Sequence, residues 1–349
     1  MKTGMSLQDM AVEIDRQSKV KRDFISPTKE LSCEIGGADE VGMNVGSYGF
    51  FTMTPTAHTQ VATRLEIPKA YYDKMLGGNK ELLRENVNAW LAHDNEKRMV
   101  RTLDSNMRAF LSHRYRPLDY LDLAKAALPV IQQMGCRIES CALTETRMYI
   151  KAVTDRLTAD VAVGDTVQAG IVISTSEVGM GSVRIEPLAF QLRCLNGMIV
   201  NDLAMRKYHV GKGQDADMAA ELFTNETQRA DDRAFWMKVG DVIKGAFNEA
   251  VFKRTVNQMK MAKGQIIEAE VVPVTEVIRE RYNLQEDEQA GILKHLIAGG
   301  DLSKYGLTNA ITRAAQDVGS YDRATELERV GGLVLDMPTV QWEALAVAR

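Results

Sequence analysis

The sequence predicts an α+β protein: a central antiparallel sheet with a basic β-hairpin, flanking helices and a helical C-terminal region. Between residues 97 and 200, short runs rich in β-branched and aromatic side chains alternate with glycine- or aspartate-containing turns, which is typical of strands. Segments with helical spacing of apolar residues lie before and after this region. With 349 residues, of which 45% are hydrophobic and 26% charged, the chain can bury a large core without disulfides or metals.

The first part of the chain differs from the rest in composition. Residues 1–60 alternate short polar pieces with glycines, as in CEIGGADEVGMNVGSYGFF, and predict an irregular N-terminal arm with one short strand. Such an arm often packs on a neighbouring subunit. An α+β core domain is expected over residues 61–264. It opens with two helices, because Pro68 stands near a helix start and Gly77-Gly78 interrupts the helical pattern.

A basic hairpin is predicted next. Residues 97–117 carry five arginines and one lysine but a single acid, Asp104. Asp104-Ser105-Asn106 is a turn cluster between two strand-like runs. If Leu103 faces Met107, the even-numbered residues share one face, which carries Arg98, Val100, Thr102, Arg108, Phe110, Ser112, Arg114 and Arg116. The other face is mostly apolar, with Arg101 and Tyr115 on it. One face would thus meet the core and the other would be basic.

The remaining elements follow in order. Residues 118–135 predict an amphipathic helix that ends at a glycine. Four strand-like segments come after it, at residues 136–145, 147–154, 169–177 and 181–200. Residues 218–263 are strongly helical in pattern, and residues 265–349 predict a region of short helices.

Composition and motifs exclude several classes. The net charge of −4 excludes a uniformly basic coat. The chain has no apolar run of the roughly 18 to 20 residues that span a membrane and no signal-peptide core, so a cytoplasmic protein without membrane contact is expected. There is no GxxxxGK[ST] motif, and the glycines of SEVGMGSV are better explained by a tight turn. Cys33, Cys136, Cys141 and Cys194 form no CxxC pair and predict reduced core thiols.

Catalytic signatures are scarce. The five histidines show no metal-binding grouping, and no GxSxG or Cys-His signature indicates a covalent nucleophile, so no catalytic residue, metal ligand or cofactor is assigned. One enzymatic alternative stays open. Asp165, Glu177 and Glu186 lie on or beside successive strand segments, as the acids of a magnesium-dependent nuclease would.

The basic hairpin is the strongest functional signal. Arginines along a strand can match phosphate spacing, and nearby aromatic rings can stack on bases. The candidate DNA-binding residues are Arg98, Arg101, Arg108, Phe110, Arg114, Tyr115, Arg116, Arg193, Arg206 and Lys207. The alternative is that these arginines form ordinary ion pairs with acids of neighbouring helices, such as Asp119 and Asp122.

Three segments carry a resemblance to a known family: AFLSHRYRPLDYLDL, GDTVQAGIVISTSEVGMGSVRIEPLAFQLRCLNGMIV and YGLTNAITRAAQD. They resemble the phage- and plasmid-borne family catalogued as domain of unknown function 932, over most of residues 60–330. The resemblance implies a mobile-element setting and supplies no reaction. The element order is also loosely similar to that of phage single-strand annealing proteins, which bind DNA without ATP and assemble into rings or filaments.

Together these observations predict ATP-independent binding of single-stranded DNA, with strand annealing in phage or mobile-element recombination as its specific form. A homo-oligomer, as a ring or filament, is expected. Two alternatives remain: the nuclease, the only case in which Mg²⁺ would be a cofactor, and a protein-binding factor that blocks a host defence system through its helical C-terminal region.

Overall fold

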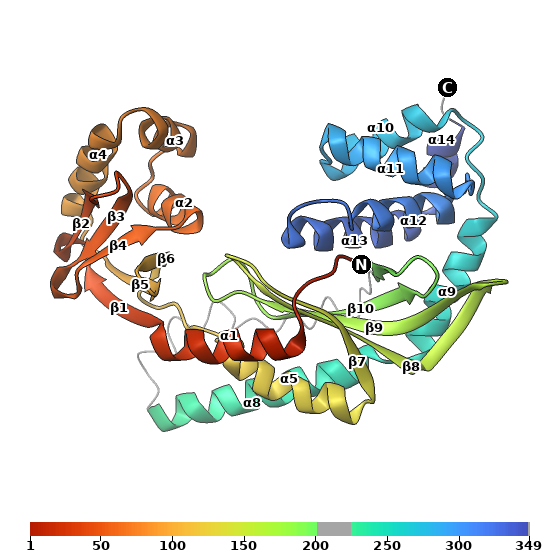
Figure 1. Cartoon of the computed structure of the whole chain (residues 1–349), viewed down its shortest axis with the longest axis horizontal. Coiled ribbons are helices and arrows are strands. Elements are labelled where there is room, and N and C mark those ends of the chain that lie inside the picture. The colour runs from red at the N-terminus through yellow and green to blue at the C-terminus, as the bar shows by residue number, and fades with distance from the viewer. Residues whose placement is uncertain (201–224, 348–349) are drawn as a thin grey trace.

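The computed structural model describes residues 1–200 and 225–347 and confirms the α+β class. Three parts follow one another along the molecule (Figure 1). A mixed sheet with its helices forms the N-terminal part, an antiparallel sheet forms the middle, and a group of helices forms the C-terminal part.

The N-terminal part is a six-stranded sheet in the order β1-β5-β6-β4-β3-β2. Its strands are β1 Arg22–Pro27, β2 Leu31–Ile35, β3 Val41–Val45, β4 Phe50–Met53, β5 Lys97–Leu103 and β6 Asn106–Ser112. Two 3-10 turns connect strands that are consecutive in the chain: Thr28–Glu30 joins β1 to β2, and Gly46–Tyr48 joins β3 to β4. The predicted irregular arm over residues 1–60 is therefore wrong. These residues form α1 (Leu7–Val20) and the strands β1 to β4. The paired strands β2, β3 and β4 are too short to show a clear alternation of apolar and polar side chains in the sequence.

Three helices pack on this sheet: α2 Pro55–Arg64, α3 Lys69–Gly78 and α4 Lys80–His93. The two helices predicted from Pro68 and the glycine pair are present, since Pro68 is the N-cap of α3 and α3 ends at Gly78. Asn79 then caps α4, where its side chain accepts a hydrogen bond from the Leu82 amide at 3.0 Å.

The predicted hairpin is β5 and β6, but its register changes once. Arg98 pairs with Ser112 and Arg101 with Ala109, as the facing of Leu103 and Met107 required. Beyond Arg101 the register shifts by one, so that Thr102 pairs with Met107 and Arg108 is left as a bulge. The hairpin also belongs to the N-terminal sheet rather than to the central one.

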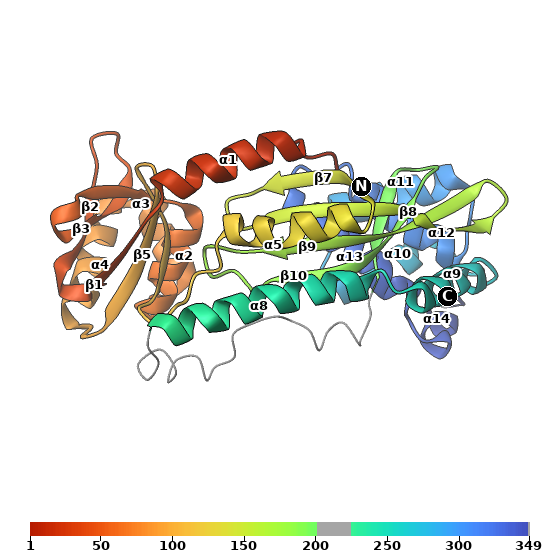
Figure 2. The same ribbon diagram turned by 90° about the horizontal axis from the view of Figure 1, so that it is seen from below.

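The central sheet has five antiparallel strands in the order β11-β10-β9-β8-β7. They are β7 Cys136–Leu143, β8 Met148–Ala162, β9 Asp165–Thr175, β10 Arg184–Gln191 and β11 Asn196–Ile199. The four predicted strand segments correspond to them, the last one being the hairpin of β10 and β11. Figure 2 shows α1, α5 (Tyr120–Gln133) and α8 (Asn225–Ala246) lying across one face. Apolar side chains of these three helices and of β7, β8, β9 and β10 share one core.

The C-terminal part is helical, as predicted. It follows α9 (Glu249–Lys263) and consists of α10 Val271–Tyr282, α11 Glu286–Gly299, α12 Lys304–Ala314, α13 Tyr321–Leu335 and α14 Thr339–Ala346.

Two ion pairs attach α13 to the central sheet. Lys151 of β8 and Glu328 of α13 lie 2.5 Å apart, and both side chains are fully buried. Arg329 binds Glu186 of β10 through both carboxylate oxygens, at 2.9 and 2.7 Å. The helix is thus fixed by charge as well as by apolar contacts.

The cysteines agree with the prediction in part. Cys33 and Cys141 are buried and Cys136 is half-buried, whereas Cys194 is exposed. Within the described residues, no helix has both the length and the apolar character to cross a membrane.

We predict a pH effect on stability from His58, which is buried on α2 and lies 2.8 Å from the hydroxyl of Tyr72. Burial lowers the pKa of His58 from 6.5 to about 4. The unfolded state therefore binds the proton first as the pH falls, and the stabilisation present above pH 6.5 is lost towards pH 4. The full effect amounts to roughly 3 kcal/mol of unfolding free energy.

Urea denaturation of the unchanged protein and of His58→Gln, at several pH values from 4 to 8, measures this effect. The free energy of unfolding of His58→Gln should depend less steeply on pH between 4 and 6.5. His93→Gln is the control, because His93 is exposed. Equal pH dependence in all three proteins would contradict the prediction.

Candidate nucleic-acid interface

The hairpin that carries the predicted DNA-binding arginines lies inside its sheet. β5 is flanked by β1 and β6, and β6 by β5 and β4. Val100 and Phe110 point into the core beneath the helices. On the other face, Met99, Ala109 and Leu111 pack against Val178, in the loop after β9. Phe110 is completely buried, so its ring offers no surface on which a base could stack.

Two of the arginines bind Glu177, at the end of β9, and so join the two sheets. Arg108 of β6 lies 3.2 Å from the Glu177 carboxylate and is 8% exposed. Lys21 lies 3.1 Å from the same carboxylate, and the Tyr120 amide donates to it at 2.7 Å. Arg101 donates to the Glu177 carbonyl oxygen at 2.7 Å.

Arg101 also has two acidic partners. Its guanidinium lies 2.8 Å from Asp23 and 2.9 Å from Asp119. Burial alone would lower the pKa of Arg101, but these carboxylates outweigh it and the pKa is raised. Burial likewise disfavours the Asp119 carboxylate, yet Arg101 and Lys21 lower its pKa. We name the set of Lys21, Asp23, Arg101, Arg108, Asp119 and Glu177 the junction cluster.

The other hairpin residues are distributed differently. Arg98 pairs with Asp94 at 2.8 Å, and Arg116 lies 2.8 Å from Asp232. Tyr115 is half-buried, and its hydroxyl lies 3.5 Å from the Ser176 carbonyl oxygen. Arg114 is exposed, and its side chain has no polar partner among the described residues. Most of the hairpin arginines therefore form ion pairs with acids of the chain itself, as the alternative interpretation of the sequence predicts, and Asp119 is one of these acids.

The three acids proposed for a magnesium site are not brought together. Asp165 begins β9 and Glu177 follows its other end, roughly 35 Å away along the strand. Asp165 accepts from Gln191 and Tyr305, Glu177 belongs to the junction cluster, and Glu186 binds Arg329. Among the described residues, no group of three His, Cys, Asp or Glu side chains could hold one metal ion.

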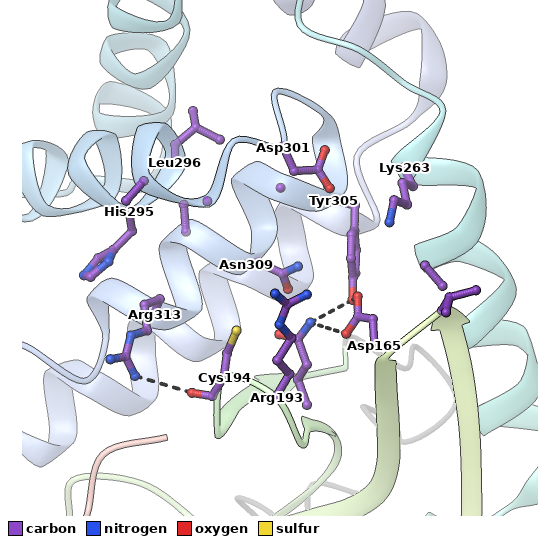
Figure 3. A pocket seen from close by; sticks show the side chains of 17 residues that line it. Asp165, Arg193, Cys194, Lys263, His295, Leu296, Asp301, Tyr305, Asn309 and Arg313 are labelled. Atoms are coloured by element: carbon purple, nitrogen blue, oxygen red, sulfur yellow. Dashed lines mark hydrogen bonds between the residues drawn. The ribbon is translucent and has the colours of Figure 1, made fainter.

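Another set of basic residues surrounds a cavity of about 470 Å³ at the far end of the central sheet. Its walls are the β8–β9 turn, the β10–β11 turn, the end of α9, the end of α11 and one face of α12. Figure 3 shows the acidic and basic side chains that line it, which are Asp165, Arg193, Lys263, His295, Asp301 and Arg313. We name this cavity the basic pocket.

The cations of the basic pocket are less neutralised than those of the hairpin. Arg193 and Lys263 are exposed and have no polar partner in the part of the chain that the structure describes. Arg313 donates to the Cys194 carbonyl oxygen at 3.4 Å and to Gln316 at 2.5 Å, both of them uncharged acceptors. His295 is the exception, since it lies 2.6 Å from Asp317.

One acid of the basic pocket is fully engaged. The hydroxyl of Tyr305 donates to Asp165 at 2.7 Å, and the side-chain amide of Gln191 donates at 2.5 Å. Burial, together with the Asp165 charge, raises the pKa of Tyr305, so the phenol keeps its proton and holds the carboxylate. Asp165 therefore organises the wall rather than neutralising the exposed cations.

Among the predicted DNA-binding residues that the structure describes, only Arg193 lines the basic pocket. Arg206 and Lys207 lie outside the described residues. Lys263, His295 and Arg313 were not predicted, because they stand on three separate helices and lie far apart in the sequence. They come together because α9 and α12 pack against the sheet and α11 packs on α12.

Comparison with family models, curated proteins and solved structures found no match to the chain. The resemblance to the phage- and plasmid-borne family stays a prediction.

The junction cluster leads to a prediction about stability. Glu177→Gln removes the carboxylate that Arg108 and Lys21 share, and its side chain is only 3% exposed. Breaking a buried ion pair by removing one partner typically destabilises a protein by about 3 kcal/mol, because the other charge stays buried and unpaired. Chemical denaturation should show a loss of this size.

Glu249→Gln is the matched control, because Glu249 is an exposed glutamate paired with Lys253. It should leave the unfolding midpoint unchanged. A Glu177→Gln variant as stable as this control would show that the junction cluster contributes little.

Proposed function

We propose that the protein binds single-stranded DNA without ATP, and that the basic pocket holds the phosphates. The observation that supports this most is the pair of exposed cations, Arg193 and Lys263, which have no polar partner among the described residues. Four of the five hairpin arginines have carboxylate partners, so the hairpin supports the same function less well.

Charge and size favour a strand passing through the basic pocket. Three basic side chains converge on it, Arg193, Lys263 and Arg313, and arginine in particular binds phosphate through two parallel hydrogen bonds. A volume of about 470 Å³ lies within the range of pockets that hold a molecule the size of a nucleotide. Binding of this kind depends on the backbone of the strand and carries little sequence preference.

The proposed setting is strand annealing during recombination of a phage or another mobile element. It draws on the resemblance of three sequence segments and on the element order, both of which are arguments by analogy. Assembly into a ring or filament belongs to the same proposal. The argument from an N-terminal arm does not support it, because residues 22–53 complete the chain's own sheet.

We predict that the double variant Arg193→Gln with Lys263→Gln binds single-stranded DNA more weakly than the unchanged protein. Each phosphate contact that is lost should reduce the slope of log affinity against log salt by about 0.7. Two lost contacts would reduce it by about 1.4. Fluorescence anisotropy with labelled single-stranded and double-stranded oligonucleotides, over a series of salt concentrations, measures both quantities.

Arg114→Gln with Lys97→Gln is the matched control, because it also removes one exposed arginine and one exposed lysine, but from the hairpin. It should leave affinity and salt slope unchanged. If only this hairpin variant bound single-stranded DNA more weakly, the DNA would bind at the hairpin and not at the basic pocket. No binding of either DNA by the unchanged protein at low salt would refute the proposed function.

A further inference from the structure

A second cluster of arginines lies at the other end of the central sheet, beside a cavity of about 270 Å³. Arg147 comes from the β7–β8 turn, Arg184 begins β10, and Arg329 stands on α13. The cavity is separated from the basic pocket by most of the length of β9, because Ser174 lines one and Asp165 the other.

The strand register explains how Arg184 reaches this cavity. Arg184 pairs with Ser174 of β9, and Ser174 pairs with Tyr149 of β8, so the three residues form one row across three strands. All three line the cavity, and α13 covers it with Arg329. The central sheet therefore holds one arginine in place, while the turn and the helix contribute the others.

Arg184 is the unusual member of the cluster. Its side chain is half-buried, yet it has no hydrogen-bond or ion-pair partner among the residues that the structure describes. Arg147, by contrast, donates to the Met180 carbonyl oxygen, and Arg329 is bound by Glu186. Burial, reinforced by the like charges of Arg147 and Arg329, lowers the pKa of Arg184. A half-buried charge without a hydrogen-bond or ion-pair partner is unfavourable, and an anion would relieve it.

The acids around the cavity already have other partners. Asp322 accepts hydrogen bonds from the hydroxyls of Thr144 and Thr146, at 3.1 and 3.0 Å. Glu326 lies 2.8 Å from Arg323, on the same helix. Neither carboxylate is paired with Arg184.

We propose that Arg147, Arg184 and Arg329 form a binding site for a terminal phosphate group, one that carries at most a single ester bond. A cavity of about 270 Å³ is smaller than those that hold drug-sized ligands, which favours a single phosphate group over a large molecule. Clustered guanidinium groups match the several oxygens and the charge of phosphate better than those of a carboxylate. The group can come from free phosphate or from the 5′ end of a nucleic-acid strand. The proposal goes beyond the strand-binding function and does not depend on it.

Calorimetric titration at constant ionic strength tests the site with three probes: inorganic phosphate, a 5′-phosphorylated trinucleotide and the same trinucleotide with a 5′ hydroxyl. Binding of inorganic phosphate would support the site and identify free phosphate as sufficient. Binding of the phosphorylated trinucleotide alone would support it and identify a strand end as the source. Failure of both inorganic phosphate and the phosphorylated trinucleotide to bind would overturn the proposal.

The variants assign the residues. Arg184→Gln should weaken phosphate binding at least about tenfold, as expected for loss of a charge-assisted hydrogen bond. Arg147→Gln should also weaken phosphate binding, and it provides the test if Arg184→Gln does not fold. Arg156→Gln is the matched control, because Arg156 is exposed on β8, roughly 23 Å along the strand from Tyr149.

The same set separates this site from the basic pocket. Arg193→Gln with Lys263→Gln should retain full phosphate affinity whether or not it binds single-stranded DNA. Unchanged affinity in folded Arg184→Gln and Arg147→Gln would overturn the assignment.

Discussion

The arrangement of the two sheets depends on one buried carboxylate, Glu177. It stands where β9 leaves the central sheet, and it receives Arg108 from the N-terminal sheet, Lys21 from the end of α1 and the first amide of α5. Asp119 and Asp23 then balance Arg101 beside it. Charges are costly to bury, and they are tolerated here because Glu177, Arg101 and Asp119 each have at least two partners. The bulge at Arg108 contributes to this arrangement, since it is the point at which β6 departs from regular pairing.

Local pattern predicted much of the secondary structure. The turn at Asp104-Ser105, the two helices around Gly77-Gly78, the helix ending before Gly135 and the strands of the central sheet all follow from periodicity and turn residues. The prediction for the first 60 residues is wrong, because strands of four to six residues interrupted by glycines leave little periodic signal.

The candidate site could be predicted much less well. Alternation along β5 and β6 shows which side chains share a face, but it does not show what covers that face. Arg101 and Arg108 meet acids that are distant in sequence, and Phe110 meets the helices of its own sheet. Conversely, Lys263 and Arg313 are far from Arg193 in the sequence, and tertiary packing alone places the three together. Long-range contact therefore decided which arginines stabilise the fold and which remain accessible to a ligand.

The fully buried pair of Lys151 and Glu328 has a consequence for behaviour on heating. The hydration of charged groups becomes less favourable as temperature rises, so the penalty for keeping this pair away from water falls. Apolar contacts gain no comparable advantage at high temperature. The attachment of α13 to the central sheet should therefore weaken less on warming than contacts that are apolar alone, and the cavity that α13 covers should keep its shape near the upper end of the protein's stable range.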